Sequence, residues 1–150
     1  MPETNSCHTL LALDYGQKRI GIAVGTTLTG TSHPLATVSN RREGTDWDHL
    51  GELIRTWEPE ALVLGLPLHA DGSSHALSEE VRRFARQLEG RFRLAVYLVD
   101  EHLTSWDAEQ ALKAQRQQGR RRRIRREEID AGAAQRILQD FLEGRVHDPA

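Results

Sequence analysis

Cysteine and long apolar runs are scarce in this 150-residue sequence. The single cysteine, Cys7, excludes an internal disulfide framework and is typical of a protein kept in a reducing compartment. The opening residues lack the basic start and apolar stretch of a signal peptide, and the longest apolar run, residues 61–68, is too short to span a bilayer. We therefore expect a cytoplasmic protein that makes no contact with a membrane.

The sequence also lacks an excess of charge of one sign, since 20 basic and 22 acidic residues leave a net charge of -2. Any affinity for nucleic acid must then come from a local basic patch. A hydrophobic content of 38% and a charged content of 28% are typical of a globular protein. The length suits one domain with its own core. We predict a single domain over residues 1–150, with flexible ends at 1–8 and 145–150.

Hydrophobic periodicity predicts an α/β protein. The expected strands cover residues 10–14, 20–24, 33–38, 61–65 and 94–99. The expected helices follow Thr45, cover 78–89, follow Thr104 and cover 127–142, with residues 66–78 as a loop. An antiparallel meander that leads into β-α-β units predicts a mixed five-stranded sheet with helices on both faces.

Two of these strands end in acids: Asp14 closes the first, and Asp100 with Glu101 closes the last. In α/β sheets, ligand sites gather beyond the strand ends. A charged side chain at the end of a buried strand must be paired, hydrated or bound to a cation. If these two strands are parallel neighbours, their acids meet.

A third acid, Asp130, shares one face of the final helix with apolar residues at helical spacing. Three converging carboxylates repel one another unless a cation lies between them. Mg²⁺ suits such a site because it prefers hard oxygen ligands and keeps several waters. Two such ions about 4 Å apart can activate a water and stabilise the leaving oxygen in phosphodiester cleavage.

Each acid also has a structural interpretation. Asp14 can begin an Asx turn. Asp100 or Glu101 can mark no more than the end of a strand. Asp130 lies in the first turns of a helix, where the macrodipole favours any acid.

The most basic stretch of the chain lies just before Asp130 and holds six arginines, namely Arg120, Arg121, Arg122, Arg123, Arg125 and Arg126. Such a segment binds phosphates through charge alone, with an affinity that falls as salt rises. The alternative is a solvated loop without a ligand. Lys18 and Arg19, close to Asp14, can also hold a phosphate.

Four blocks of the sequence resemble the motifs of the YqgF/RuvX family, in the family's order and spacing. They are residues 13–23 (LDYGQKRIGIA), 63–68 with Asp71-Gly72 (VLGLPL), 99–105 (VDEHLTS) and 129–134 (IDAGAA). In the third block, His102 stands where the family commonly has arginine, and Ser105 where it commonly has threonine. Together the blocks cover nearly the whole chain.

The resemblance implies a ribonuclease-H-like fold and a metal-dependent nuclease of Mg²⁺ or Mn²⁺ that matures the 5′ end of pre-16S rRNA. It implies that Asp14, Glu101 and Asp130 are the catalytic, metal-binding acids. Asp100 is the alternative to Glu101, with which the family's glutamate aligns. The implied partners are pre-rRNA and ribosomal precursor particles, bound by a monomer or a homodimer. Branched DNA, as in a Holliday-junction resolvase, is the alternative substrate.

Two other functional classes are open. An ATP-binding protein of the actin or sugar-kinase type also begins with a strand, an acid and a glycine-containing hairpin, but it needs a second similar domain. An RNA-binding ribosome-assembly factor with little catalysis would not need the acids.

Overall fold

The computed structural model describes residues 8–41, 43–69, 71, 73, 76–103, 125–144 and 148–149, and within these ranges it leaves out the side chains of 102, 103, 125–130, 148 and 149. The strands are β1 (Thr9–Tyr15), β2 (Arg19–Thr26), β3 (Thr31–Arg41), β4 (Gly44–Thr45), β5 (Ala61–His69), β6 (Ala95–Leu103) and β7 (Asp148–Pro149). The helices are α1 (Trp47–Trp57), α2 (Ala76–Phe92) and α4 (Arg125–Leu142).

The strands form one mixed sheet in the order β4-β3-β2-β1-β5-β6-β7. The first three strands pair antiparallel, whereas β5 lies parallel to both β1 and β6. This confirms the predicted α/β class and the meander that leads into parallel strands. The count of five was too low for the described part of the chain, because β4 and β7 are two-residue strands, too short to show a period.

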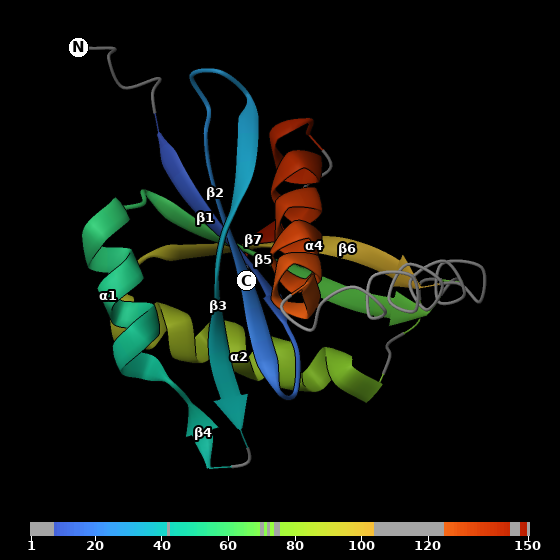
Figure 1. Ribbon diagram of the computed structural model, residues 1–150. Helices are drawn as coiled ribbons and strands as arrows, with labels where there is room; N and C mark the ends of the chain where they lie inside the picture. Colours follow the sequence, from blue (N-terminus) through green and yellow to red (C-terminus); the bar gives the residue numbers. More distant parts are fainter. Residues whose placement is uncertain are drawn as a thin grey trace.

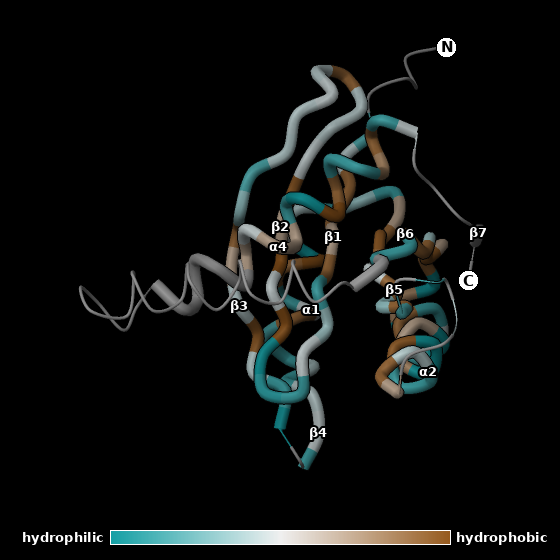
Figure 2. Tube along the Cα trace, turned by 90° about the vertical axis from the view of Figure 1, so that its right-hand side faces the viewer, coloured by the Kyte–Doolittle hydropathy of each residue, from teal (hydrophilic) through white to brown (hydrophobic). Residues whose placement is uncertain are grey.

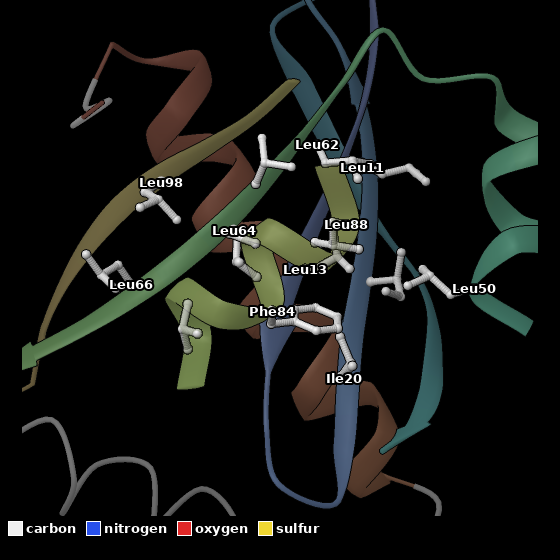
Figure 3. Close-up of a cluster of buried hydrophobic side chains, with 14 of the residues drawn as sticks. Leu11, Leu13, Ile20, Leu50, Leu62, Leu64, Leu66, Phe84, Leu88 and Leu98 are labelled. Atoms are coloured by element: carbon white, nitrogen blue, oxygen red, sulfur yellow. The ribbon is translucent and has the colours of Figure 1, made fainter. Parts of the chain in front are cut away.

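Helices cover both faces of the sheet, with α1 and α2 on one side and α4 on the other (Figure 1). Strand residues alternate between these faces. Leu11 and Leu13 join the core under α1 and α2, which Figure 3 shows in part, whereas Leu10 and Ala12 pack against α4. The parity of a residue along β1, β5 or β6 therefore tells which helix layer it faces.

Two strands run further than predicted. The β5 strand continues through Pro67 to His69, where a loop was expected, and β6 continues to Leu103, so Asp100 and Glu101 lie inside it. The register of β1 with β5 ends at Leu64, whereas that of β5 with β6 extends to His69. Pro67 is thus tolerated where β5 is paired along one side.

The first helix also starts differently from the prediction that Thr45 caps it. Asp46 is the N-cap, and its carboxylate accepts a hydrogen bond from the backbone N–H of His49 at 3.2 Å. The hydroxyl of Thr45 instead donates to Oδ1 of Asn40 at 2.8 Å. Spacing alone does not separate two neighbouring cap residues, since both are good caps.

Some predictions fall on other parts of the chain. The helix expected after Thr104 and the arginines at 120–123 lie outside the described residues. Of the terminal segment, Asp148 and Pro149 are described and pair with Leu98 and Tyr97. In the described part of the chain, no helix has both the length and the apolar character needed to cross a membrane.

Candidate active site

Asp14 and Glu101 lie on the same face of the sheet, the one that α4 covers. Asp14 follows Leu10 and Ala12 at the spacing of two that keeps residues on one face, and those two pack against α4. Glu101 has the same parity along β6 as Tyr97 and Val99, which pack against α4 as well. The two acids come from strands separated by β5 alone.

The strand between the two acids has a glycine beside Asp14, two residues before Pro67, which is the partner of Glu101. Gly65 follows Leu64, the partner of Leu13, and pairs with Val99 on β6. A Cβ atom on Gly65 would stand 2.6 Å from Cδ1 of Ile137 and 3.4 Å from Cγ of Glu101. The missing side chain therefore lets α4 approach and lets Glu101 lean over β5 toward β1.

Asp100, the alternative to Glu101, faces the other way. It shares the parity of Val96 and Leu98, which belong to the core under α1 and α2. Its atom Oδ1 is buried. Consecutive residues of a strand point to opposite faces, so Asp100 and Glu101 cannot both face α4. The geometry favours Glu101 as the partner of Asp14.

Asp130 lies in the N-terminal part of α4, and the structure describes its backbone position only. It precedes Ile137 by seven residues, about two helical turns, so both occupy the same side of the helix. Further along α4, Gln139 donates to the carbonyl of Gly30, in the turn at the end of the sheet where β1 begins. The N-terminal half of α4 therefore points toward the end where β1 stops.

The turn after Asp14 is held in place by contacts to α2 and β3. Glu80 accepts hydrogen bonds from the Tyr15 hydroxyl at 3.2 Å and from Nε2 of Gln17 at 3.1 Å. Nδ2 of Asn40 donates to the carbonyl of Gly16 at 2.6 Å. A Cβ on Gly16 would stand 2.5 Å from the carbonyl oxygen of Arg19, so the tightness of the turn itself requires glycine here.

The predicted cationic residues have different positions. Lys18 is exposed and Arg19 is half-buried, both at the β1–β2 turn. Arg125 and Arg126 open α4, a few residues before Asp130. A cation that the sequence prediction missed is Arg136, whose Nη2 lies 3.9 Å from Oε1 of Glu101. No pattern pointed to it, because an arginine on an amphipathic helix is ordinary.

The donor set suits a divalent cation. Two carboxylates on one face, with a glycine between them, offer the hard oxygen ligands that such ions prefer. The Glu101 side chain is 17% exposed, so its charge needs a nearby positive partner. Among the described side chains no group of three His, Cys, Asp or Glu residues forms a metal site; the Asp130 carboxylate lies outside that set.

This chain is similar along most of its length to proteins named as nucleases. The sequence of a protein of Methylobacillus flagellatus named as a candidate pre-16S rRNA nuclease is 44% identical over 143 residues, 95% of this chain and 96% of that protein. A protein of Burkholderia thailandensis with the same name is 46% identical over 136 residues, 91% of this chain and 88% of that protein. These relatives are named as nucleases.

The sequence model of the RuvX family, described as Holliday junction resolvase, matches residues 8–144. This chain belongs to the RuvX family. The resemblance to this family and the predicted mixed α/β sheet are confirmed, as is the prediction of a nuclease that hydrolyses phosphodiester bonds. Among solved structures, T. thermophilus RuvC in complex with Holliday junction substrate overlaps with a TM-score of 0.48, at 16% identity over 95% of this chain and 99% of that one.

Proposed function

We propose that this chain is a nuclease that cleaves the 5′ region of the 16S rRNA precursor in the cytoplasm, using Mg²⁺ or Mn²⁺ held by Asp14, Glu101 and Asp130. The observation that carries the proposal is the shared face of Asp14 and Glu101 across Gly65. The substrate is the one in the names of the relatives, which match along nearly the whole chain.

In this proposal each group of residues has its own role. Asp14 and Glu101 supply carboxylate oxygens from the sheet, and Asp130 supplies the third from α4. These carboxylates would hold the divalent ion, and the ion when bound would supply the charge needed to activate a water molecule and to stabilise the leaving oxygen. The guanidinium of Arg136, close to Glu101, offsets part of the acidic charge that would repel a phosphate. The arginines at 120–123, 125 and 126 then hold the substrate backbone through charge.

The proposal is tested with end-labelled pre-16S rRNA, with and without Mg²⁺ or Mn²⁺. We expect metal-dependent cleavage by the native chain and no cleavage by Asp14→Asn. The circular dichroism spectrum and melting temperature of Asp14→Asn should equal those of the native chain. Asp48→Asn is the matched control, because Asp48 is exposed on α1, across the sheet from the acids. Full activity of Asp14→Asn, or cleavage in the presence of a chelator, would refute the assignment.

A second candidate is the resolution of branched DNA, favoured by the description of the family as Holliday junction resolvase. A four-way junction has two-fold symmetry, so its resolution needs two active sites and hence a homodimer. A labelled junction in the same assay, together with the mass in solution, separates the candidates. Cleavage of pre-rRNA by a monomer that leaves the junction intact excludes the resolvase.

A further inference from the structure

The acids are followed, on the same face of the sheet, by a row of cations. Asp14 pairs with Gly21 on β2, and Arg19 lies two residues beyond Gly21, which is one repeat along the face. Arg19 in turn pairs with Ser39 on β3, and Arg41 is one repeat further along β3. A step of two residues is about 7 Å along a strand. Positive charge thus begins one step away from Asp14.

These cations border a surface groove. It has a volume of about 650 Å³ and is lined by residues 17–19 and 39–41 together with Glu43. Lys18 and Arg41 are exposed, and Gln17 and Ser39 add uncharged hydrogen-bonding groups. The β1–β2 turn is a hydrophilic segment at this end of the molecule (Figure 2). Three basic side chains against one acid leave the groove positively charged.

The groove is held in shape by a buried side chain. Asn40 is 5% exposed, and it donates from Nδ2 to the Gly16 carbonyl at 2.6 Å and from its backbone N–H to the Lys18 carbonyl at 3.0 Å. Its Oδ1 accepts from Thr45 at 2.8 Å. The turn that carries Lys18 is therefore fastened to the strand that carries Arg41. Such a fixed arrangement lowers the entropy lost when a ligand binds.

We infer that this groove binds the phosphate backbone of the substrate strand where the strand leaves the acidic site, with Arg41 of β3 as a binding residue beside Lys18 and Arg19. This inference rests on the proposed function, which makes Asp14 part of the site where the strand is cleaved. From Asp14 the nucleic acid would run over the ends of β2 and β3. The groove recognises the charge and spacing of the backbone phosphates and has no preference for a particular base.

The test measures binding of a fluorescein-labelled single-stranded RNA by anisotropy, in EDTA to prevent cleavage, between 50 and 200 mM KCl. The salt slope is the slope of log affinity against log salt concentration, and loss of one phosphate contact lowers its magnitude by roughly 0.7 for a single strand. Between 50 and 200 mM KCl the variant should therefore lose about 2.6-fold less affinity than the native chain does. We expect this change for Arg41→Gln and for Lys18→Gln. Arg41→Lys keeps the charge and should keep the native slope.

The matched control is Arg86→Gln, which removes the same charge from an exposed site on α2, away from the groove. It should keep the native slope. A native slope for Arg41→Gln, an equal change for Arg86→Gln, or no RNA binding by the native chain at 50 mM KCl would each overturn the inference. Because no cleavage is involved, these results are independent of the pre-rRNA assay. If the native chain binds RNA in this groove but does not cleave pre-rRNA, the proposed reaction is refuted and the inference about the groove stands.

Discussion

Ile137 of α4 packs directly on Gly65 of β5, with its Cδ1 only 2.6 Å from the point where a Cβ of residue 65 would stand. Both residues are buried. The contact sets how closely α4 approaches the sheet between Asp14 and Glu101. The packing of this part of the core therefore affects the distance between α4 and the two acids of the candidate site.

Gly65→Ala should lower the free energy of unfolding by about 1–3 kcal/mol, because a methyl group is forced into a filled space. Urea unfolding measures this. Ile137→Val removes Cδ1 and should return part of the loss in the double variant. Gly90→Ala is the control: a Cβ at this helical position meets nothing within 4 Å. It should be neutral or stabilising by up to about 1 kcal/mol. Native stability of Gly65→Ala would show that α4 packs differently.

Glu101→Gln should reduce metal-dependent cleavage of pre-rRNA by at least about a hundredfold, since even residues that only support metal ligands cost 10- to 100-fold when mutated. Asp100→Asn should keep activity, because Asp100 faces the layer of α1 and α2. Rates are compared at saturating metal, after melting curves show that both variants are folded. The reverse pattern would assign the metal to Asp100 and contradict the parity of β6.

Asp46→Ala should lower the free energy of unfolding by about 1 kcal/mol, because the N–H of His49 loses its hydrogen-bond acceptor. Asp46→Asn keeps a cap oxygen, so its free energy of unfolding should equal that of the native chain to within a few tenths of a kcal/mol. Chemical denaturation of the two variants side by side decides this. Equal losses would mean that the charge, and not the cap, stabilises α1.

The pKa of Asp71 lies below its ordinary value, chiefly because the Ser73 hydroxyl donates to its carboxylate and secondarily because the Ser73 backbone N–H does. These bonds favour the ionised form of Asp71. Their contribution to the stability of the folded state is therefore present at neutral pH and is lost as the pH falls through the lowered pKa. Ser73→Ala should raise the pKa of Asp71 toward its ordinary value. An NMR titration of the carboxyl carbon follows this, with Asp48, an exposed acid, as the reference. An unchanged pKa in Ser73→Ala would contradict the hydrogen-bonded turn.

Most elements were predictable because their periodicity is local. The meander, the two parallel strands and the apolar faces of α1 and α2 all follow from the spacing of apolar residues. The ends of β5 and β6 were not predictable, because the extra residues, such as Pro67 with Glu101, are held by pairing between distant segments. Thr45 and Asp46 likewise needed coordinates to be told apart as caps of α1.

The same division holds for the candidate site. Residue types and motif order alone determined the family and the class of reaction, and they nominated Asp14, Glu101 and Asp130 as the candidate acids, because these depend on chemistry that each segment carries by itself. Only the tertiary structure decided that Glu101 and not Asp100 shares a face with Asp14, and that Arg41 continues the row of cations. The physical reason is that strand register and parity are set by hydrogen bonds between segments far apart in the chain.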